Sequence, residues 1–341
     1  MNAIWSDWAL KRWLGVVISL LALVSSAAPM RTQTVALSAG WNAVWLEVAP
    51  EQDSPSVLFA GKPVDIVAAY ALPVSEAQFA KNKTVNMQSL AGWKVWYAPH
   101  RADASLSRLG RLSPHTGYLI HALSAVTLSI KGEVVAGEVQ WTPNRFSLVG
   151  FSVAGSAAPT FKQFFQGSTA HNHNKVYRLK EGTWRQVLQL DAETLRSGEA
   201  FWIYSDGPSV YQGPLSVKAN GSLGLVLGNS DKGSVAFRNE TPHPLAFTLS
   251  LVTDEGNTAL PLAAVVSVLC SNALGKVDAP VNFPDGGWTQ TFPAFEPGAG
   301  LTLPMVLRMR DVQPGSYSGL LKVTTDLGTE TWLPVRATRE E

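Results

Sequence analysis

Two histidines near the middle of the chain have the spacing of a metal-binding pair. The segment His171-Asn172-His173-Asn174 carries imidazoles at positions i and i+2, which point to the same side of an extended backbone. Neutral imidazoles at that spacing bind transition metals such as zinc. A metal-dependent hydrolase with His171 and His173 as ligands is therefore one hypothesis. The sequence identifies no third ligand, and a polar solvated loop is the simpler interpretation of the same segment.

Tryptophan is the second residue type with binding chemistry, because the apolar face of an indole ring can stack on the C–H face of a pyranose. Nine tryptophans follow residue 27. Four occupy recurring positions in the chain, which favours a role in packing: Trp41, Trp93, Trp184 and Trp202. Three others lack that explanation, and we expect them to be exposed ligand-binding residues: Trp45, Trp96 and Trp288. These three carry a carbohydrate-binding hypothesis.

Motifs of other catalytic chemistries are missing from the sequence. It contains no phosphate-binding loop, HExxH, CxxC, EF-hand or dinucleotide fingerprint. The glycines of a nucleophile elbow occur in Gly315-Ser-Tyr-Ser-Gly319, but Tyr317 stands at the nucleophile position. The single cysteine, Cys270, lies in an apolar run, which is typical of a small buried hydrophobe. We therefore expect a non-enzymatic protein with no cofactor.

The N-terminus has the three-part layout of a secretory signal peptide. Lys11 and Arg12 precede an apolar run at residues 13–24, and small residues follow it. Cleavage near Ala27 leaves 25 basic and 25 acidic residues, so we expect no general attraction to nucleic acid or anionic lipid. No later run is long enough to span a bilayer. The lone cysteine excludes an internal disulfide and favours a bacterial origin. These features predict a protein that is secreted, periplasmic or on the cell surface.

An internal repeat follows the predicted signal peptide (1–27). Residues 41–48 match 146–153, and residues 117–120 match 200–203, each pair sharing an aromatic and apolar pattern. Pro55 and Pro159 follow the first match in each copy and could begin a short helix, with Ser54 as the N-cap of the first. We therefore expect two related units, 28–135 and 136–215. Each would be a small antiparallel sheet with one short helix.

A third unit with a different pattern begins near residue 216. Apolar residues alternate at 245–251, 301–309 and 317–323, and turn signals separate seven or eight short strands. This count and spacing are typical of an immunoglobulin-like β-sandwich. We assign this unit to residues 216–341, so the whole chain is predicted to be mainly β.

Two local patterns resemble known bacterial families. The segments 234–245 (SVAFRNETPHPL) and 314–326 (PGSYSGLLKVTTD) look like strands of bacterial immunoglobulin-like domains, without the Cys…Trp…Cys framework of antibody domains. Gly40-Trp41-Asn42 is similar to GWN-type segments of large exported bacterial proteins. These resemblances imply a sandwich fold and an envelope or extracellular location, and they imply no catalytic residue.

Together these features predict an exported structural, adhesion or display protein of the bacterial cell envelope. Its partner would be a cell-envelope protein or a polysaccharide. The alternatives are a carbohydrate-binding protein that uses exposed tryptophans and, less favoured, a metal-dependent hydrolase.

Overall fold

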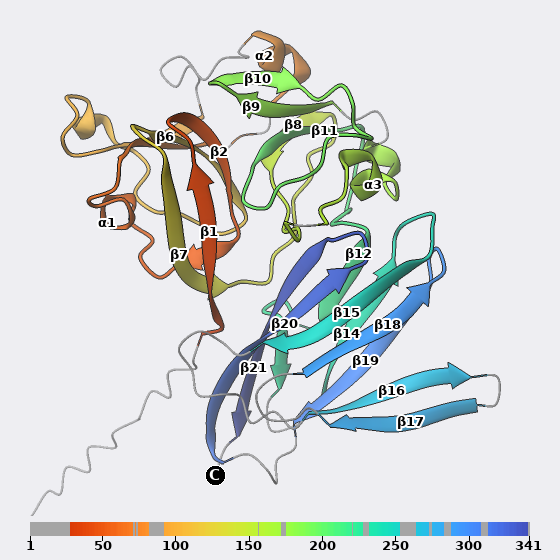
Figure 1. Cartoon of the computed structure of the whole chain (residues 1–341). Coiled ribbons are helices and arrows are strands. Elements are labelled where there is room, and N and C mark those ends of the chain that lie inside the picture. Colours follow the sequence, from red (N-terminus) through yellow and green to blue (C-terminus); the bar gives the residue numbers. More distant parts are fainter. Residues whose placement is uncertain are drawn as a thin grey trace, which may run out of the picture.

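The computed structural model describes residues 28–339 except 71, 73, 82–91, 156, 172–174, 220, 228–231, 253–263, 273–274, 283–287 and 308–312. The predicted signal peptide and His173 lie outside the described residues. The side chains of Cys270 and Trp288 do so as well. The described chain is mainly β, as the sequence predicts, with five antiparallel or mixed sheets and a few short helices (Figure 1).

The first part of the chain forms two sheets that pack face to face. Strands β1 (Met30–Leu37), β7 (Val126–Val134) and β3 (Val48–Pro50) form one sheet in the order β1-β7-β3. The other sheet has the order β2-β6-β4-β5 and contains β2 (Gly40–Leu46), β6 (Thr116–Ala122), β4 (Val64–Tyr70) and β5 (Trp93–Tyr97). Apolar side chains from both sheets form a shared core, which includes Val35, Val44, Val67, Ile120 and Leu128.

The next part forms a second four-stranded sheet with the order β8-β11-β9-β10. Its strands are β8 (Arg145–Val149), β11 (Phe201–Ser205), β9 (Val176–Lys180) and β10 (Thr183–Gln186). In both four-stranded sheets the first strand in sequence pairs with the fourth, the fourth with the second, and the second with the third, all antiparallel. A short helix follows the first strand in each case, α1 (Pro55–Leu58) and α3 (Phe161–Phe165).

Helix α3 shows how the sequence determines this local structure. Thr160 accepts a hydrogen bond from the Gln163 backbone N–H, and the Gln163 side chain accepts one from the Thr160 N–H, which makes a complete capping box. The i, i+3, i+4 spacing of Phe161, Phe164 and Phe165 puts all three rings on the buried side of the helix. Phe161 packs edge-on against Phe201 of β11, with ring centroids 5.1 Å apart.

Three further helical segments lie in connections. These are α2 (Glu76–Lys81) and two single 3-10 turns, η1 (Ala104–Leu106) and η2 (Thr169–His171). Phe79 of α2 stacks on Phe146 of β8 with ring centroids 4.6 Å apart, so the connection after β4 packs against the second four-stranded sheet.

The last part of the chain forms two five-stranded sheets. One has the order β12-β14-β19-β16-β17, with β12 (Leu215–Ala219), β14 (Lys232–Asn239), β19 (Gly300–Leu307), β16 (Ala264–Asn272) and β17 (Gly275–Asn282). The other has the order β13-β21-β20-β15-β18, with β13 (Leu225–Leu227), β21 (Glu330–Arg339), β20 (Gly315–Thr325), β15 (Leu245–Val252) and β18 (Trp288–Phe295). Inward-facing residues of both sheets form one core around Phe237, Phe247 and Phe292.

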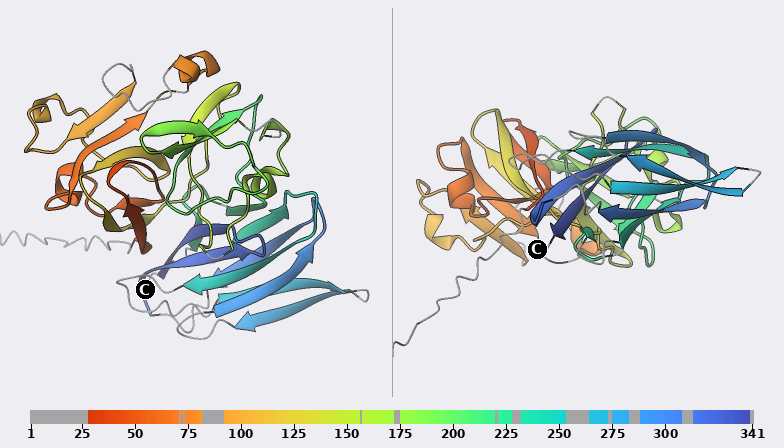
Figure 2. Two further views of the ribbon diagram at one scale, coloured as in Figure 1. Left: turned by 45° about the horizontal axis from the view of Figure 1, so that its top comes forward. Right: turned by 90° about the horizontal axis from the view of Figure 1, so that it is seen from below.

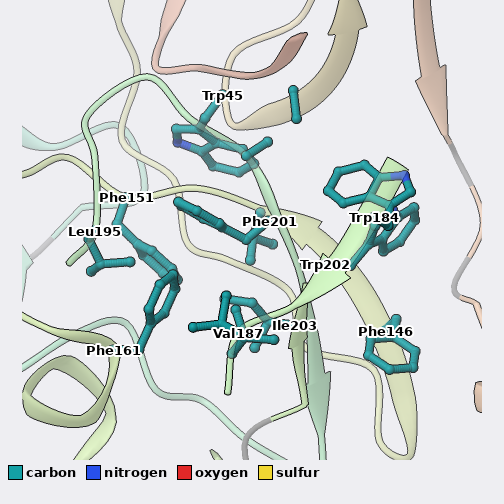
Figure 3. Packing of buried hydrophobic residues seen from close by; sticks show 14 of the residues in the cluster. Trp45, Phe146, Phe151, Phe161, Trp184, Val187, Leu195, Phe201, Trp202 and Ile203 are labelled. Carbon is teal, nitrogen blue, oxygen red and sulfur yellow. The ribbon is translucent and has the colours of Figure 1, made fainter. Parts of the chain in front are cut away.

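The sheet β2-β6-β4-β5 is covered on both faces. One face packs on β1-β7-β3, and the other joins the aromatic core of the second four-stranded sheet, which contains Trp45, Phe146, Phe201 and Trp202 (Figure 3). The two five-stranded sheets lie on one side of this assembly (Figures 1 and 2). The three parts are therefore in direct contact with one another.

Candidate functional site

The prediction that Trp45 and Trp96 are exposed is wrong. Their side chains are 4% and 5% exposed. Trp45 lies in the aromatic core between the two four-stranded sheets (Figure 3). Trp96 faces the opposite core, where its indole N–H donates to Ser56 Oγ at 2.9 Å. The physical reason is that both faces of their sheet are covered, so alternate residues point into two different cores. With both rings buried, neither tryptophan offers a face for a sugar.

The remaining tryptophans divide differently from the prediction. Trp184 and Trp202 are buried, which confirms their expected role in packing. Trp41, expected in the core, is only partly buried. Trp288 is the first residue of β18, and a binding role for its side chain stays a prediction.

His171 is buried in an aromatic pocket. Its ring lies 4.2 Å from that of Trp141 and 4.9 Å from that of Phe165. The two ring nitrogens are each 3.3 Å from a protein oxygen, Nδ1 from the Tyr204 carbonyl and Nε2 from Ser209 Oγ. Burial lowers the pKa of His171 to about 4, because the charged imidazolium would lose its hydration.

This environment gives His171 a structural role. Both nitrogens already face protein groups, and the ring is 1% exposed. Within the described ranges, no three His, Cys, Asp or Glu side chains are grouped so that they could hold a metal ion. Pairing of His171 with His173 in a metal site stays a prediction, because His173 is outside those ranges.

A buried carboxylate with partners in distant parts of the chain belongs to Glu47, which follows β2. It forms an ion pair with Arg31 of β1 and accepts hydrogen bonds from Ser152 Oγ at 2.8 Å and Ser197 Oγ at 3.3 Å. The Glu47 backbone N–H donates to Gln33 Oε1 at 2.8 Å. A carboxylate from the first part of the chain is therefore bonded to two hydroxyls of the second part, 105 and 150 residues away.

Residues of β21, in the third part of the chain, also contact this group. The Arg31 guanidinium carbon lies 4.8 Å from the centre of the Trp332 ring, a cation–π contact to β21. The Glu330 backbone N–H donates to the Ser152 carbonyl at 2.9 Å. We call Arg31, Glu47, Ser152, Ser197 and Trp332 the junction. A cavity of about 160 Å³ adjoins it and is lined by residues of all three parts.

Close backbone contact accompanies the junction. The Ala154 N–H donates to the Gly328 carbonyl at 2.8 Å, and Val153 forms a β-bridge with Thr329. Gly328 has φ of 77°, and a Cβ at this position would lie 1.9 Å from the Ala157 carbonyl oxygen. Only glycine permits this approach between the second and third parts of the chain.

The sequence could not have identified the junction, because it depends on contacts across more than a hundred residues. Its chemistry is that of a structural tie between distant parts of the chain: the carboxylate is charge-paired and doubly hydrogen-bonded, which leaves little of it for reaction. One weak signal was available in the repeat. Gly150 stands where the first copy has Trp45, and a Cβ there would lie 2.4 Å from Cβ of Trp45.

A second polar cluster lies at one end of β4 and β6, the two central strands of the sheet β2-β6-β4-β5. Asp65 is in a bulge of β4, and its carboxylate lies 2.6 Å from both His121 Nδ1 and Arg101 Nη1. Arg101 also binds Asp103, and these bonds raise the pKa of the guanidinium. An Asp–His pair can orient an imidazole as a base. Here the carboxylate is shared with an arginine, so its charge is already paired.

Comparisons with known proteins do not assign this chain to a family. No protein-family model matches the chain, and no curated protein matches it. Among solved structures, the ASH/PapD-like domain of human CEP192 (PapD-like domain 7) is similar over 38% of this chain and 87% of that one, with 8% identity and a TM-score of 0.22. The CupB6 tip adhesin from Pseudomonas aeruginosa aligns over 92% of this chain and 93% of its own length, with 10% identity and a TM-score of 0.19.

An Escherichia coli alpha-2-macroglobulin activated by porcine elastase aligns over 92% of this chain but 33% of its own length, with 9% identity and a TM-score of 0.20. At such scores the similarities assign neither a fold family nor a function. Over the described residues, no helix has the length and apolar character needed to cross a membrane.

Proposed function

We propose that this protein is an exported, non-enzymatic structural component of the bacterial cell envelope, acting in adhesion or display. The observation that carries the proposal is the junction, where three β-rich units are tied by a buried ion pair, two serine hydroxyls and a cation–π contact. Such ties oppose the relative motion that is the default between domains in one chain. A stiff assembly of small β units suits a surface protein that must hold a contact region at a fixed distance and angle.

We also propose that residues 28–135 and 136–215 are duplicated units and that residues 216–341 form an immunoglobulin-like sandwich. The identical strand order of the two four-stranded sheets supports the duplication, as does the short helix after the first strand of each. The matched segments 117–120 and 200–203 fall on equivalent strands, β6 and β11. Two facing five-stranded sheets with a shared core support the sandwich.

The test is expression of the full chain with a C-terminal tag in a bacterial host, followed by fractionation and an adherence assay. The proposal predicts loss of the first 27 or so residues by mass spectrometry. It also predicts that the protein separates from cytoplasmic marker proteins on fractionation and that cells attach more to a surface or to each other. A variant that disrupts the junction, Glu47→Ala, should reduce attachment at equal protein level. The exposed Glu51→Ala, outside the junction, is its matched control. Retention in the cytoplasm, or attachment equal to that of cells lacking the protein, would contradict the proposal.

A further inference from the structure

A groove of about 730 Å³ runs between the first two units, on the edge of β2. One wall is the corner between β1 and β2, residues 35–44. The other wall is formed by the β9–β10 hairpin and the segment 196–199. This volume lies within the range of roughly 300–1,000 Å³ that small-molecule sites occupy.

Trp41 lies on this groove with its ring held in place. The ring meets His121 edge-on, with centroids 5.0 Å apart, and His121 is fixed in turn by Asp65. Gly182 also lies next to the ring: an added Cβ there would be 3.6 Å from Trp41 Cδ1. The Trp41 side chain is partly exposed, and its indole N–H donates to no residue of the described chain. A fixed, partly exposed ring with a free donor is a preorganised contact surface.

The backbone of Trp41 adds two more hydrogen-bonding groups. Ala43, two residues after Trp41 on β2, accepts a hydrogen bond at its carbonyl from the Ala200 N–H at 3.0 Å. Trp45, two residues later, donates its N–H to the Gly198 carbonyl at 2.9 Å. Alternate residues of a strand direct their backbone groups to the same edge. The N–H and C=O of Trp41 therefore point to this edge as well, and no strand in the described ranges pairs with them there.

Charged groups of both signs line the opposite wall. Glu199 lies 2.9 Å from the buried Arg178 through Oε1 and 4.0 Å from Arg196 through Oε2. Glu181 stands at the tip of the β9–β10 hairpin, where Glu181 and Gly182 both have positive φ, as a type I′ turn requires. Mixed charges on one wall favour neither an anion nor a cation as ligand.

We propose that this groove binds a short oligosaccharide of neutral pyranose units, one of which stacks on Trp41. Sugar hydroxyls both donate and accept hydrogen bonds, and the groove offers both kinds of partner: the indole N–H, the backbone groups of Trp41 and the side chains of Glu181 and Arg196. The ring supplies the apolar face that a pyranose needs. This binding site goes beyond the proposed scaffold role and does not depend on export or on adhesion.

The test is titration of the purified chain with maltotriose, cellotriose and triacetylchitotriose, followed by calorimetry and by intrinsic tryptophan fluorescence. We expect saturable binding of at least one of them. Trp41→Ala should weaken that binding at least about tenfold, the size of loss typical of an anchoring aromatic residue. Trp41→Phe, which keeps a stacking ring, should recover part of it.

Two further variants separate binding from folding. Arg196→Gln changes an exposed rim side chain and should weaken binding severalfold with an unchanged urea midpoint. Leu188→Ala, at an exposed position outside the groove, is the matched control and should bind as the unmodified chain does. The proposal fails if none of the three sugars binds, if Trp41→Ala and Arg196→Gln leave the Kd unchanged, or if peptides of a casein digest bind the groove and sugars do not.

Discussion

Replacing Glu47 by alanine tests whether the junction holds the three parts of the chain together. The substitution removes a carboxylate that is 6% exposed, bonded to Arg31, Ser152 and Ser197. It leaves a guanidinium that is 16% exposed without its counter-charge. Removing one partner of a buried ion pair costs about 3–5 kcal/mol. Because Arg31 retains some access to water, we expect the lower end of this range, about 3 kcal/mol.

The assay is urea unfolding followed by tryptophan fluorescence. A chain of this size has a denaturant slope near the upper end of about 1–3 kcal/mol per molar urea. A loss of about 3 kcal/mol therefore lowers the midpoint by roughly 1 M. Glu47→Gln keeps an acceptor for the serine hydroxyls and loses only the charge, so we expect a smaller loss of about 1–2 kcal/mol.

Two comparisons make the result decisive. The double variant Arg31→Met/Glu47→Ala removes both charges and should be more stable than Glu47→Ala alone, since no unpaired guanidinium remains. Glu181→Ala, at an exposed position, should change stability by less than about 0.5 kcal/mol. If Glu47→Ala shifts the midpoint no more than Glu181→Ala does, the junction contributes nothing to stability and the rigid scaffold loses its physical basis.

Three other predictions address separate features. The pKa of His171 is lowered to about 4 in the folded chain, whereas the unfolded value is near 6.5, so the unfolded state takes up the proton first as the pH falls. The free energy of unfolding should therefore be highest above pH 6.5 and fall by about 3 kcal/mol as the pH drops towards 4. Urea midpoints measured across this range should show that loss, and a His171→Leu variant should lack it. Gly328→Ala should lower the free energy of unfolding by about 2 kcal/mol more than Gly298→Ala. Both glycines have φ near 75°, but only at Gly328 would the added Cβ meet a carbonyl oxygen, and equal urea midpoints would contradict this. Trp288→Ala should abolish retention of the chain on insoluble polysaccharide if the predicted role of that residue is right, and unchanged co-sedimentation would exclude it.

The sequence predicts much of the fold because strand alternation is a local signal. The apolar alternation at 245–251 and 317–323 falls within β15 and β20. Both expected short helices are present: α1 begins at Pro55 as predicted, whereas α3 begins two residues after Pro159. The capping detail differs: Ser54 stands at the N-cap of α1 without a side-chain bond, whereas Thr160 caps α3 fully.

The candidate sites could not be predicted in the same way, because exposure depends on what covers a sheet. Trp45 and Trp96 point to opposite faces of their sheet, yet both faces are buried. Trp41 shares its face with Trp45 but lies nearer the strand end, where cover by the second unit gives way to the groove. Likewise the contacts of Glu47 with Ser152 and Ser197 have no local signature in the sequence.

The long separation of those contacts has a consequence for how the chain acquires its structure. Glu47 reaches its last partner, Ser197, only when 150 further residues are available. Loop closure over such distances is slow compared with local pairing. During synthesis the N-terminal strands must therefore wait with the Glu47 carboxylate lacking its two serine partners and with one sheet face uncovered. Late completion of folding would suit the export proposed above, because a channel that takes extended polypeptide needs a chain that has not yet folded.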